Sequence, residues 1–286
     1  MIRIENDYLR IDVNPAGAEL TGLYHKKRRT EYLWQAGKAW PKQSPVLFPV
    51  VGQLKENTYR YKGRSYTLPR HGFARERVFD LIEKKADQLR FRLSDDTESR
   101  KVYPFAFHFD ILYTLHEREL EVAYTIYNTG DDDLYFSVGA HPAFRLPFDV
   151  RETYEDYYLE FEKEEDALRW PLDQGLISSQ AIPFFTGKKI PLTKALFAND
   201  ALVFKNIRSE KIFLRSRKNE QGLLVKINRC PFLGLWAAKD ADFLCIEPWQ
   251  GIADSVNATG NIEEKEGIIR LLPGEKFTCS WGAGPL

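Results

Sequence analysis

Alternation of apolar and polar residues is the dominant pattern along the chain. Every second residue is apolar or aromatic over residues 107–115, and the alternation returns over residues 120–126 after a short charged turn. It resumes over residues 134–138, beyond an Asn-Thr-Gly turn and three aspartates. A period of two is that of a β-strand with one buried face. We therefore expect these three segments to form an antiparallel meander.

Shorter segments predict further strands. Residues 9–13 alternate, an Asn-Pro-Ala-Gly turn follows, and the pattern resumes over residues 18–20. Additional strands are expected over residues 202–207, 211–215, 223–228, 232–237 and 243–247. Helical periodicity is limited to a turn or two over residues 163–170 and 192–198. Many short strands with regularly spaced turns are typical of an all-β fold, and a large antiparallel β-sandwich fits best. Without a linker-like stretch or an internal repeat, residues 1–286 are expected to form a single domain.

Composition narrows the classes of function. With 43% hydrophobic residues, the 286-residue chain can bury a substantial core. Lys plus Arg equals Asp plus Glu at 41 each, which argues against a broad surface for nucleic acid or anionic membranes. The three cysteines form no CxxC motif and suggest no disulfide framework, which favours a reducing compartment. No signal peptide or long apolar span is evident, so we expect a cytoplasmic protein.

A histidine at the end of an alternating segment is the first candidate for chemistry. Over residues 134–141 one alternate set is apolar and predicted to face the core, and His141 belongs to the other set, with Ser137 and Gly139. These small neighbours leave room for a ligand, and Pro142 ends the strand. An imidazole at the edge of such a hollow can act as a general acid or base near neutral pH.

Two further segments place titratable groups among small or apolar residues. In the first, Gly72 permits a tight backbone path next to His71, and Arg75 adds a cation. In the second, Glu247 ends an apolar strand and is followed by proline, as His141 is. Trp249 offers an aromatic face suited to stacking on a sugar ring. Taken singly, such residues are more often structural than catalytic.

Four motifs in order carry a resemblance to a known family. They are the segments Leu-Phe-Pro-Val-Val-Gly at 47–52, His-Gly-Phe-Ala-Arg at 71–75, Gly-Ala-His-Pro-Ala-Phe at 139–144 and Cys-Ile-Glu-Pro-Trp at 245–249. With them the chain resembles the aldose 1-epimerases, or mutarotases, and within these the branch named for the LacX protein. The resemblance covers nearly the whole chain. It implies the large antiparallel β-sandwich often called a supersandwich, in agreement with the strand pattern.

The resemblance implies interconversion of the α and β anomers of an aldose by ring opening and closure, without a cofactor. Glu247 is then the base on the anomeric hydroxyl, and His141 the acid that protonates the ring oxygen. His71 is the second histidine of the family, which orients the sugar. The partner implied is a monosaccharide, namely a hexose in free or phosphorylated form, bound by a monomer or a homodimer.

The same resemblance implies binding residues around the sugar. Arg75 is placed on a sugar hydroxyl or a phosphate, and Asp200 aligns with an aspartate that holds sugar hydroxyls. The chain departs from relatives that carry an arginine upstream of the first histidine, because residues 43–53 contain none. Substrate identity therefore does not follow from the resemblance.

Three other functions fit parts of the pattern. A carbohydrate-binding or sensing protein would keep the pocket and lack turnover. A metal site would use His71, His141 and Glu247, although these lie far apart in sequence. A glycosidase would need a second well-placed carboxylate beside Glu247.

Overall fold

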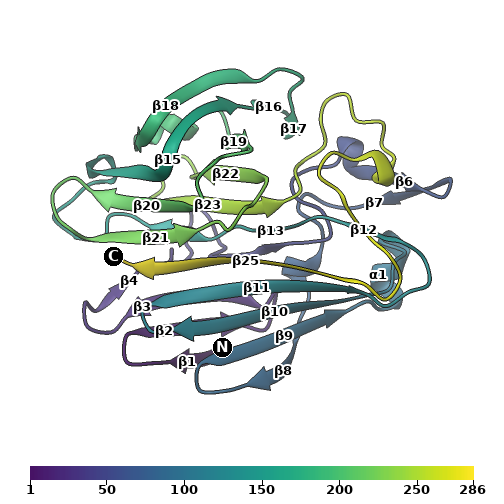
Figure 1. Ribbon diagram of the computed structural model, residues 1–286, viewed down its shortest axis with the longest axis horizontal. Helices are drawn as coiled ribbons and strands as arrows, with labels where there is room; N and C mark the ends of the chain where they lie inside the picture. The colour runs from purple at the N-terminus through teal and green to yellow at the C-terminus, as the bar shows by residue number, and fades with distance from the viewer.

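The computed structural model describes residues 1–286, and antiparallel strands dominate it (Figure 1). The first half of the chain contains the strands β1 (Ile2–Glu5), β2 (Leu9–Asn14), β3 (Glu19–His25), β4 (Thr30–Glu31), β5 (Val46–Leu47), β6 (Thr58–Tyr61), β7 (Arg64–Thr67), β8 (Asp80–Lys84), β9 (Gln88–Ser94), β10 (Phe107–His116), β11 (Glu119–Asn128), β12 (Leu134–Phe136), β13 (Val138–Ala140) and β14 (Ala143–Arg145). The second half contains β15 (Tyr157–Arg169), β16 (Leu172–Asp173), β17 (Leu176–Ile177), β18 (Ile182–Pro191), β19 (Leu202–Lys205), β20 (Lys211–Ser216), β21 (Gly222–Lys226), β22 (Phe232–Trp236), β23 (Phe243–Gln250), β24 (Ile269–Leu271) and β25 (Lys276–Pro285).

Helical structure is sparse. There is one short α-helix, α1 (Thr97–Val102), and there are five 3₁₀ turns, η1 (Lys55–Asn57), η2 (Ala74–Glu76), η3 (Tyr154–Asp156), η4 (Lys194–Phe197) and η5 (Ile262–Glu264). None of these helices has the length and apolar character that a membrane crossing requires.

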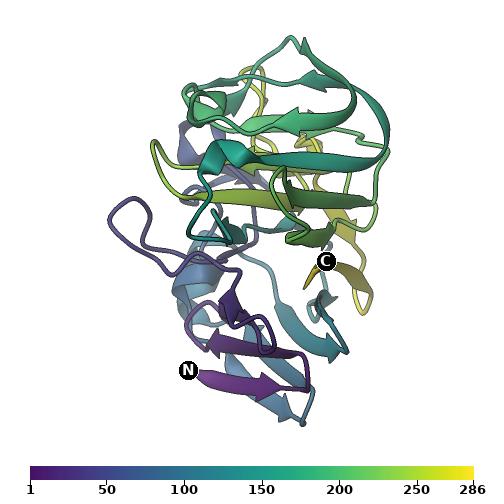
Figure 2. The ribbon, with the colours of Figure 1, turned by 90° about the vertical axis from the view of Figure 1, so that its left-hand side faces the viewer.

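A 15-stranded sheet forms the frame of the molecule, in the order β5-β13-β23-β22-β19-β15-β20-β21-β25-β11-β10-β9-β8, with β14 on β23 and β18 on β15. A separate four-stranded sheet, β1-β2-β3-β4, lies at the end of the molecule opposite β15 and β18 (Figure 2). Its buried residues Leu9, Ile11 and Val13 alternate with partly exposed ones, as the pattern predicts. The all-β prediction and the predicted strands in 202–247 are confirmed.

The predicted meander is confirmed only for its first two strands. β10 and β11 pair from Phe107↔Asn128 to His116↔Glu119. The prediction was wrong for residues 134–138, because β12 pairs with β24 and the C-terminal strand β25 lies next to β11. The amide of Asn128 donates to the carbonyls of Asp132 and Leu271, which fixes the chain as it leaves the sheet. Alternation shows that a segment is a strand but does not identify its partner.

The two segments expected to be helical have different outcomes. Residues 163–170 do not form a helix, because 163–169 complete the long strand β15, paired with β18. Charged residues there, among them the buried Glu165 that accepts hydrogen bonds from Ser209, concealed the period of two. In the other segment, 192–198, the single 3₁₀ turn η4 forms, so that expectation is confirmed.

Most of the core is one large apolar cluster between the layers. A second cluster of eight buried residues lies on the other side of β13 and β23, and consists of Leu47, Val51, Ile177, Val203, Phe232, Trp249, Ile252 and Ala253. On β13, Val138 and Ala140 face the large cluster, whereas a side chain at Gly139 would meet Leu47, Val51 and Trp249 of the small one. The alternation predicted for this strand is therefore confirmed, and the small cluster forms the floor of a pocket.

Candidate active site

A pocket of about 250 Å³ opens above the small apolar cluster. It is lined by all six residues singled out from the sequence, namely His71, Arg75, His141, Asp200, Glu247 and Trp249. It is also lined by Trp40, Arg70 and Trp236, which sequence reasoning missed. The long-range pairing of strands brings residues from 40 to 253 to one place.

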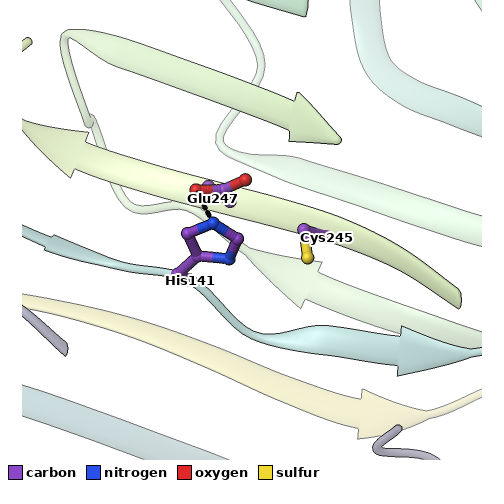
Figure 3. Close-up of side chains that lie close together, drawn as sticks. All are labelled: His141, Cys245 and Glu247. Atoms are coloured by element: carbon purple, nitrogen blue, oxygen red, sulfur yellow. Dashed lines mark ion pairs between the residues drawn. The ribbon is translucent and has the colours of Figure 1, made fainter. Parts of the chain in front are cut away.

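The register of three strands places His141 opposite Glu247. β13 pairs with β23 at Gly139↔Trp249, and β14 pairs with β23 at Ala143↔Cys245. The two residues between β13 and β14 therefore face the middle of β23. There Nε2 of His141 lies 3.3 Å from Oε2 of Glu247, and both side chains are almost fully buried (Figure 3).

Burial controls the protonation of this pair. Desolvation, with a smaller contribution from the cations Arg70 and Arg75, lowers the pKa of His141 to about 3. Desolvation raises the pKa of Glu247 well above its ordinary value, although Arg70 opposes this effect. Both shifts favour the uncharged forms, a carboxylic acid beside a neutral imidazole.

The pair is left with hydrogen-bonding capacity unused. Nδ1 of His141, Oε2 of Glu247 and Nε1 of Trp249 are buried and make no hydrogen bond of ordinary geometry. Buried polar atoms in native proteins usually have a hydrogen-bond partner. A buried atom without one needs an explanation, such as a bound ligand or a catalytic role. A ligand with several hydroxyl groups, bound in this pocket, would offer hydrogen-bond partners to all three atoms.

Aromatic rings hold the imidazole of His141 in place. Trp40 stacks on it with ring centroids 5.0 Å apart, and Trp236 contacts it edge-on at 5.7 Å. His71 also packs against it at 5.7 Å with nearly perpendicular ring planes. Trp40 lies in a stretch without regular periodicity, so the sequence offered no signal that would bring it here.

The indole ring of Trp249, on β23, lies over the strands on both sides of β23. It can do so because β13 and β22 each have a glycine there. A Cβ at Gly234 would come within 2.4 Å of the indole ring, and one at Gly139 within 2.7 Å. Either substitution would displace the ring or the strand. The small residues next to His141 therefore make room for a protein side chain as well as for a ligand.

A tight turn fixes the orientation of His71. Its φ is 68° and that of Gly72 is 71°, and a Cβ at Gly72 would lie 2.3 Å from the carbonyl oxygen of Phe48. The backbone N–H of Gly52 donates to Nδ1 of His71 at 3.1 Å. Burial lowers the pKa of His71 well below its ordinary value, so the ring is neutral and carries its proton on Nε2.

The remaining predicted residues lie at the edge of the pocket. Asp200 is in the left-handed region with φ of 80°, and its carboxylate accepts a hydrogen bond from the N–H of Ala201. Arg75 is partly buried, and its guanidinium donates to the carbonyl of Arg70 at 3.0 Å. Arg70 is exposed and immediately precedes His71.

The potential metal ligands that cluster include two of the three considered from the sequence, with Cys245 in place of His71. His141, Cys245 and Glu247 have ligand atoms within 4.8 Å of one another, whereas Nδ1 of His71 is occupied by Gly52. Figure 3 shows Glu247 next to Nε2 of His141 and Cys245 on another side of the ring. Burial also raises the pKa of the Cys245 thiol well above its ordinary value, which disfavours the thiolate that metals bind.

Comparisons with known proteins identify relatives in sequence and in fold. The sequence profile of the aldose 1-epimerase family matches residues 1–281. The chromosomal LacX protein of Lactococcus lactis is 32% identical over 285 residues, covering 95% of both chains. A galactose mutarotase related enzyme from Lactobacillus acidophilus superimposes with a TM-score of 0.95 at 35% identity, covering 100% of this chain and 97% of the other. A galactose mutarotase-like protein from Lactobacillus casei gives 0.92 at 27% identity, covering 100% of both chains.

Proposed function

Because the chain belongs to the aldose 1-epimerase family, we propose that it interconverts the α and β anomers of an aldose by opening and reclosing the sugar ring. The observation that carries this proposal is the His141–Glu247 pair, buried, 3.3 Å apart and facing a pocket of sugar size. The anomeric oxygen and the ring oxygen are bonded to the same carbon. Two adjacent acid–base groups can therefore reach both of them.

The proton of the pair is conserved through the proposed cycle. In ring opening, Glu247 as carboxylate takes the proton of the anomeric hydroxyl, and His141 as imidazolium gives its proton to the ring oxygen. The C1–ring oxygen bond breaks, and the aldehyde can rotate about C1–C2. The pair now consists of a carboxylic acid and a neutral imidazole, which is the state that burial favours.

Closure then reverses each transfer. Glu247 returns its proton to the carbonyl oxygen while His141 takes the proton of the hydroxyl that attacks C1. Opening needs the ion pair and closure needs the neutral pair, and the two differ by one proton transfer between the side chains. Arg70 favours the carboxylate form of Glu247 and at the same time disfavours the imidazolium form of His141. Acid–base assistance of this kind typically contributes 10²–10⁴-fold per group.

The other pocket residues are assigned to positioning in this proposal. The Nε2–H of His71 serves as a donor beside the ring oxygen, and Asp200 accepts from sugar hydroxyls. Trp249 covers an apolar face of the sugar ring. No redox centre or Lewis acid is required by the proton transfers.

The test is exchange of anomers measured by NMR or polarimetry on a panel of free and phosphorylated aldoses. Acceleration above the buffer rate is expected for at least one sugar, and loss of that acceleration is expected in Glu247→Gln. Glu164→Gln, at an exposed glutamate outside the pocket, is the matched control. Sugar binding without acceleration would instead identify a sensing or carrier protein. Absence of both would overturn the proposal.

A further inference from the structure

Ring opening requires a positive charge on His141 that most of the surrounding groups oppose. Desolvation lowers the pKa of this imidazole to about 3, and the cations Arg70 and Arg75 act in the same direction. His71, which packs against the ring with nearly perpendicular planes, is kept neutral by its own burial, which lowers its pKa. Glu247 provides the only carboxylate within 4.0 Å of a nitrogen of this ring.

The imidazole of His141 also lacks the hydrogen bond that commonly stabilises a charged histidine. In many enzymes the second ring nitrogen donates to a carboxylate or to a backbone carbonyl. Nδ1 of His141 is buried and has no such partner. Its own backbone carbonyl raises the pKa, but desolvation has the larger effect. The nearby thiol of Cys245 is held neutral, because burial raises its pKa. The faces of the imidazole ring are the remaining place from which its charge can be stabilised.

One of these faces is covered by Trp40. The two ring centroids lie 5.0 Å apart, and the ring planes differ by 26°. An aromatic face within about 6 Å of a cation attracts it, most strongly for tryptophan and more so where water is excluded. The imidazole is neutral in the state that burial favours and charged in the ion pair from which the ring opens. The indole therefore stabilises the reacting state more than the resting state, which is the condition for a gain in rate.

The backbone of residues 34–43 holds Trp40 in this position. Both ends of the segment are bonded to Ala143, two residues after His141. The N–H of Ala143 donates to the carbonyl of Gln43 at 2.9 Å, and its carbonyl accepts from the N–H of Trp34 at 2.9 Å. The carbonyl of Trp40 accepts a further hydrogen bond from Nε1 of Trp34 at 2.9 Å. The indole and the imidazole are thus positioned by one set of backbone contacts.

We propose that Trp40 is a positioning residue for anomer exchange, whose indole face stabilises the imidazolium form of His141. This inference rests on the acid–base role proposed for His141. The effect applies in both directions of the reaction. In ring opening the imidazolium is the proton donor, and in closure it forms as His141 takes the proton of the attacking hydroxyl. The value of kcat, rather than sugar binding, is therefore expected to depend on the indole face.

The experiment replaces Trp40 by tryptophans that carry one, two or four fluorine atoms on the six-membered ring. Fluorine withdraws electron density from the ring face and leaves the shape nearly unchanged, so the packing around His141 is retained. Anomer exchange is measured by NMR on the fastest-exchanging of glucose, galactose and their 6-phosphates. The logarithm of kcat should fall stepwise along the series, by about 2- to 30-fold in total, with KM nearly constant.

Two comparisons separate this electronic effect from packing. The same fluorinated residues at Trp281, which is buried away from the pocket and bonded to Tyr124, should leave kcat unchanged. Trp40→Phe, which retains a ring face, should keep more of kcat than Trp40→Leu. Equal values of kcat in these two variants would contradict the inference.

A kcat that does not change with fluorination of Trp40, or that falls equally with fluorination of Trp281, would overturn the inference and leave anomer exchange intact. A rise in KM at constant kcat would overturn it in favour of a surface that stacks on the sugar. Failure of the unmodified protein to accelerate exchange of any of these sugars would refute the proposed function and, with it, this inference.

Discussion

Two buried pairs of a carboxylate and a nitrogen base have carboxylates that lie close together in sequence, Glu247 and Asp254, but the hydrogen bonding of the two pairs differs. Nζ of Lys265 lies 3.1 Å from Asp254 and also donates to the carbonyl of Ile252. The other oxygen of Asp254 accepts from the backbone N–H of Lys55 at 2.9 Å. In contrast, His141 and Glu247 are left with unpaired buried atoms. Both pairs are almost inaccessible to solvent.

The difference separates a structural pair from a functional one. The first pair holds the segment after β23, whose Ala253 lines the pocket, against residues 53–55. Every strong donor and acceptor there has a partner within the protein, which is the condition for a stable buried ion pair. The second pair, His141 and Glu247, lines the pocket and has donor and acceptor atoms without a hydrogen-bond partner in the protein. Burial alone therefore does not identify a catalytic carboxylate, and unused hydrogen-bonding capacity is the more informative feature.

The largest expected effect is on activity, in Glu247→Gln. The amide has the same shape but cannot accept and return a proton, so anomer exchange should fall about 10²–10⁴-fold. Because the carboxyl group is buried without full compensation, the free energy of unfolding should stay equal or rise. Urea denaturation and NMR exchange measure the two quantities. A variant that loses stability and keeps activity would reverse the roles assigned to the two pairs.

The same isosteric change at the other pair should have the opposite outcome. Asp254→Asn leaves the Lys265 ammonium buried without its counter-charge, which typically costs about 3–5 kcal/mol. The free energy of unfolding should fall by that order, measured by urea denaturation. Below its melting temperature the folded variant should retain most of its anomer exchange. A severe loss of exchange at unchanged stability would show that this pair participates in catalysis.

The sequence distinguishes these two pairs only in part. His141 and Glu247 could be singled out because each follows an apolar alternation and precedes a proline, which are local features. His141 does follow the end of β13, but the expectation that Glu247 ends its strand was wrong, because β23 continues through Pro248 to Gln250 and keeps pairing with β22. Lys265 follows two glutamates and precedes a third, so it resembles an exposed charge cluster although it is buried. Its burial depends on contacts with the segment after β23, which no local pattern encodes.

The same limit explains the errors in the fold and the site. Residues 163–169 carry so many charges that their strand alternation is lost, although pairing with β18 makes them a strand. Arg70 was overlooked although it directly precedes the motif at 71–75, because exposed arginines are common in turns. Trp40 reaches His141 from an irregular segment. Local alternation thus predicted the class of fold, while the choice of strand partners and the far walls of the pocket depended on long-range packing.

A smaller effect is expected in the pH dependence of stability. Below about pH 6.5 the unfolded chain protonates His71 and His141, whereas burial keeps both neutral in the folded state. The unfolded state then binds more protons, so the free energy of unfolding falls as the pH falls. Glu247 acts in the opposite sense, since the folded state retains its proton above the pH at which the unfolded carboxyl loses it.

Removing one histidine isolates its share of this slope. Between about pH 5 and pH 6, His141→Asn should reduce the slope of stability against pH by up to about 1.4 kcal/mol per pH unit. Urea denaturation at a series of pH values measures the change. His116→Asn, at an exposed histidine, is the control. An equal change in the control would show that burial in the pocket is not the cause.

The smallest expected effect distinguishes two roles for Trp249. Its indole N–H acts on Glu247 by lowering the pKa of that carboxyl, although burial has the larger and opposite effect. Trp249→Phe retains an aromatic ring at this position, removes this donor, and also removes part of the ring system that lies against Gly234. We expect kcat to fall about two- to tenfold, the worth of one weak hydrogen bond, with KM nearly constant. The ionisation of Glu247 in the pH profile of kcat should move to higher pH.

Trp281→Phe, which removes an indole N–H bonded to Tyr124 away from the pocket, is the control for loss of a tryptophan donor. A rise in KM at constant kcat and an unchanged pH profile would mean that Trp249 contacts the sugar alone. The indole would then be a binding surface, and the open capacity of Glu247 would be available entirely to substrate. A shift of the pH profile would instead show that the indole N–H of Trp249 donates weakly to Glu247. The carboxylate would then be partly hydrogen-bonded by the protein, unlike Asp254, and would keep acceptor capacity for the substrate.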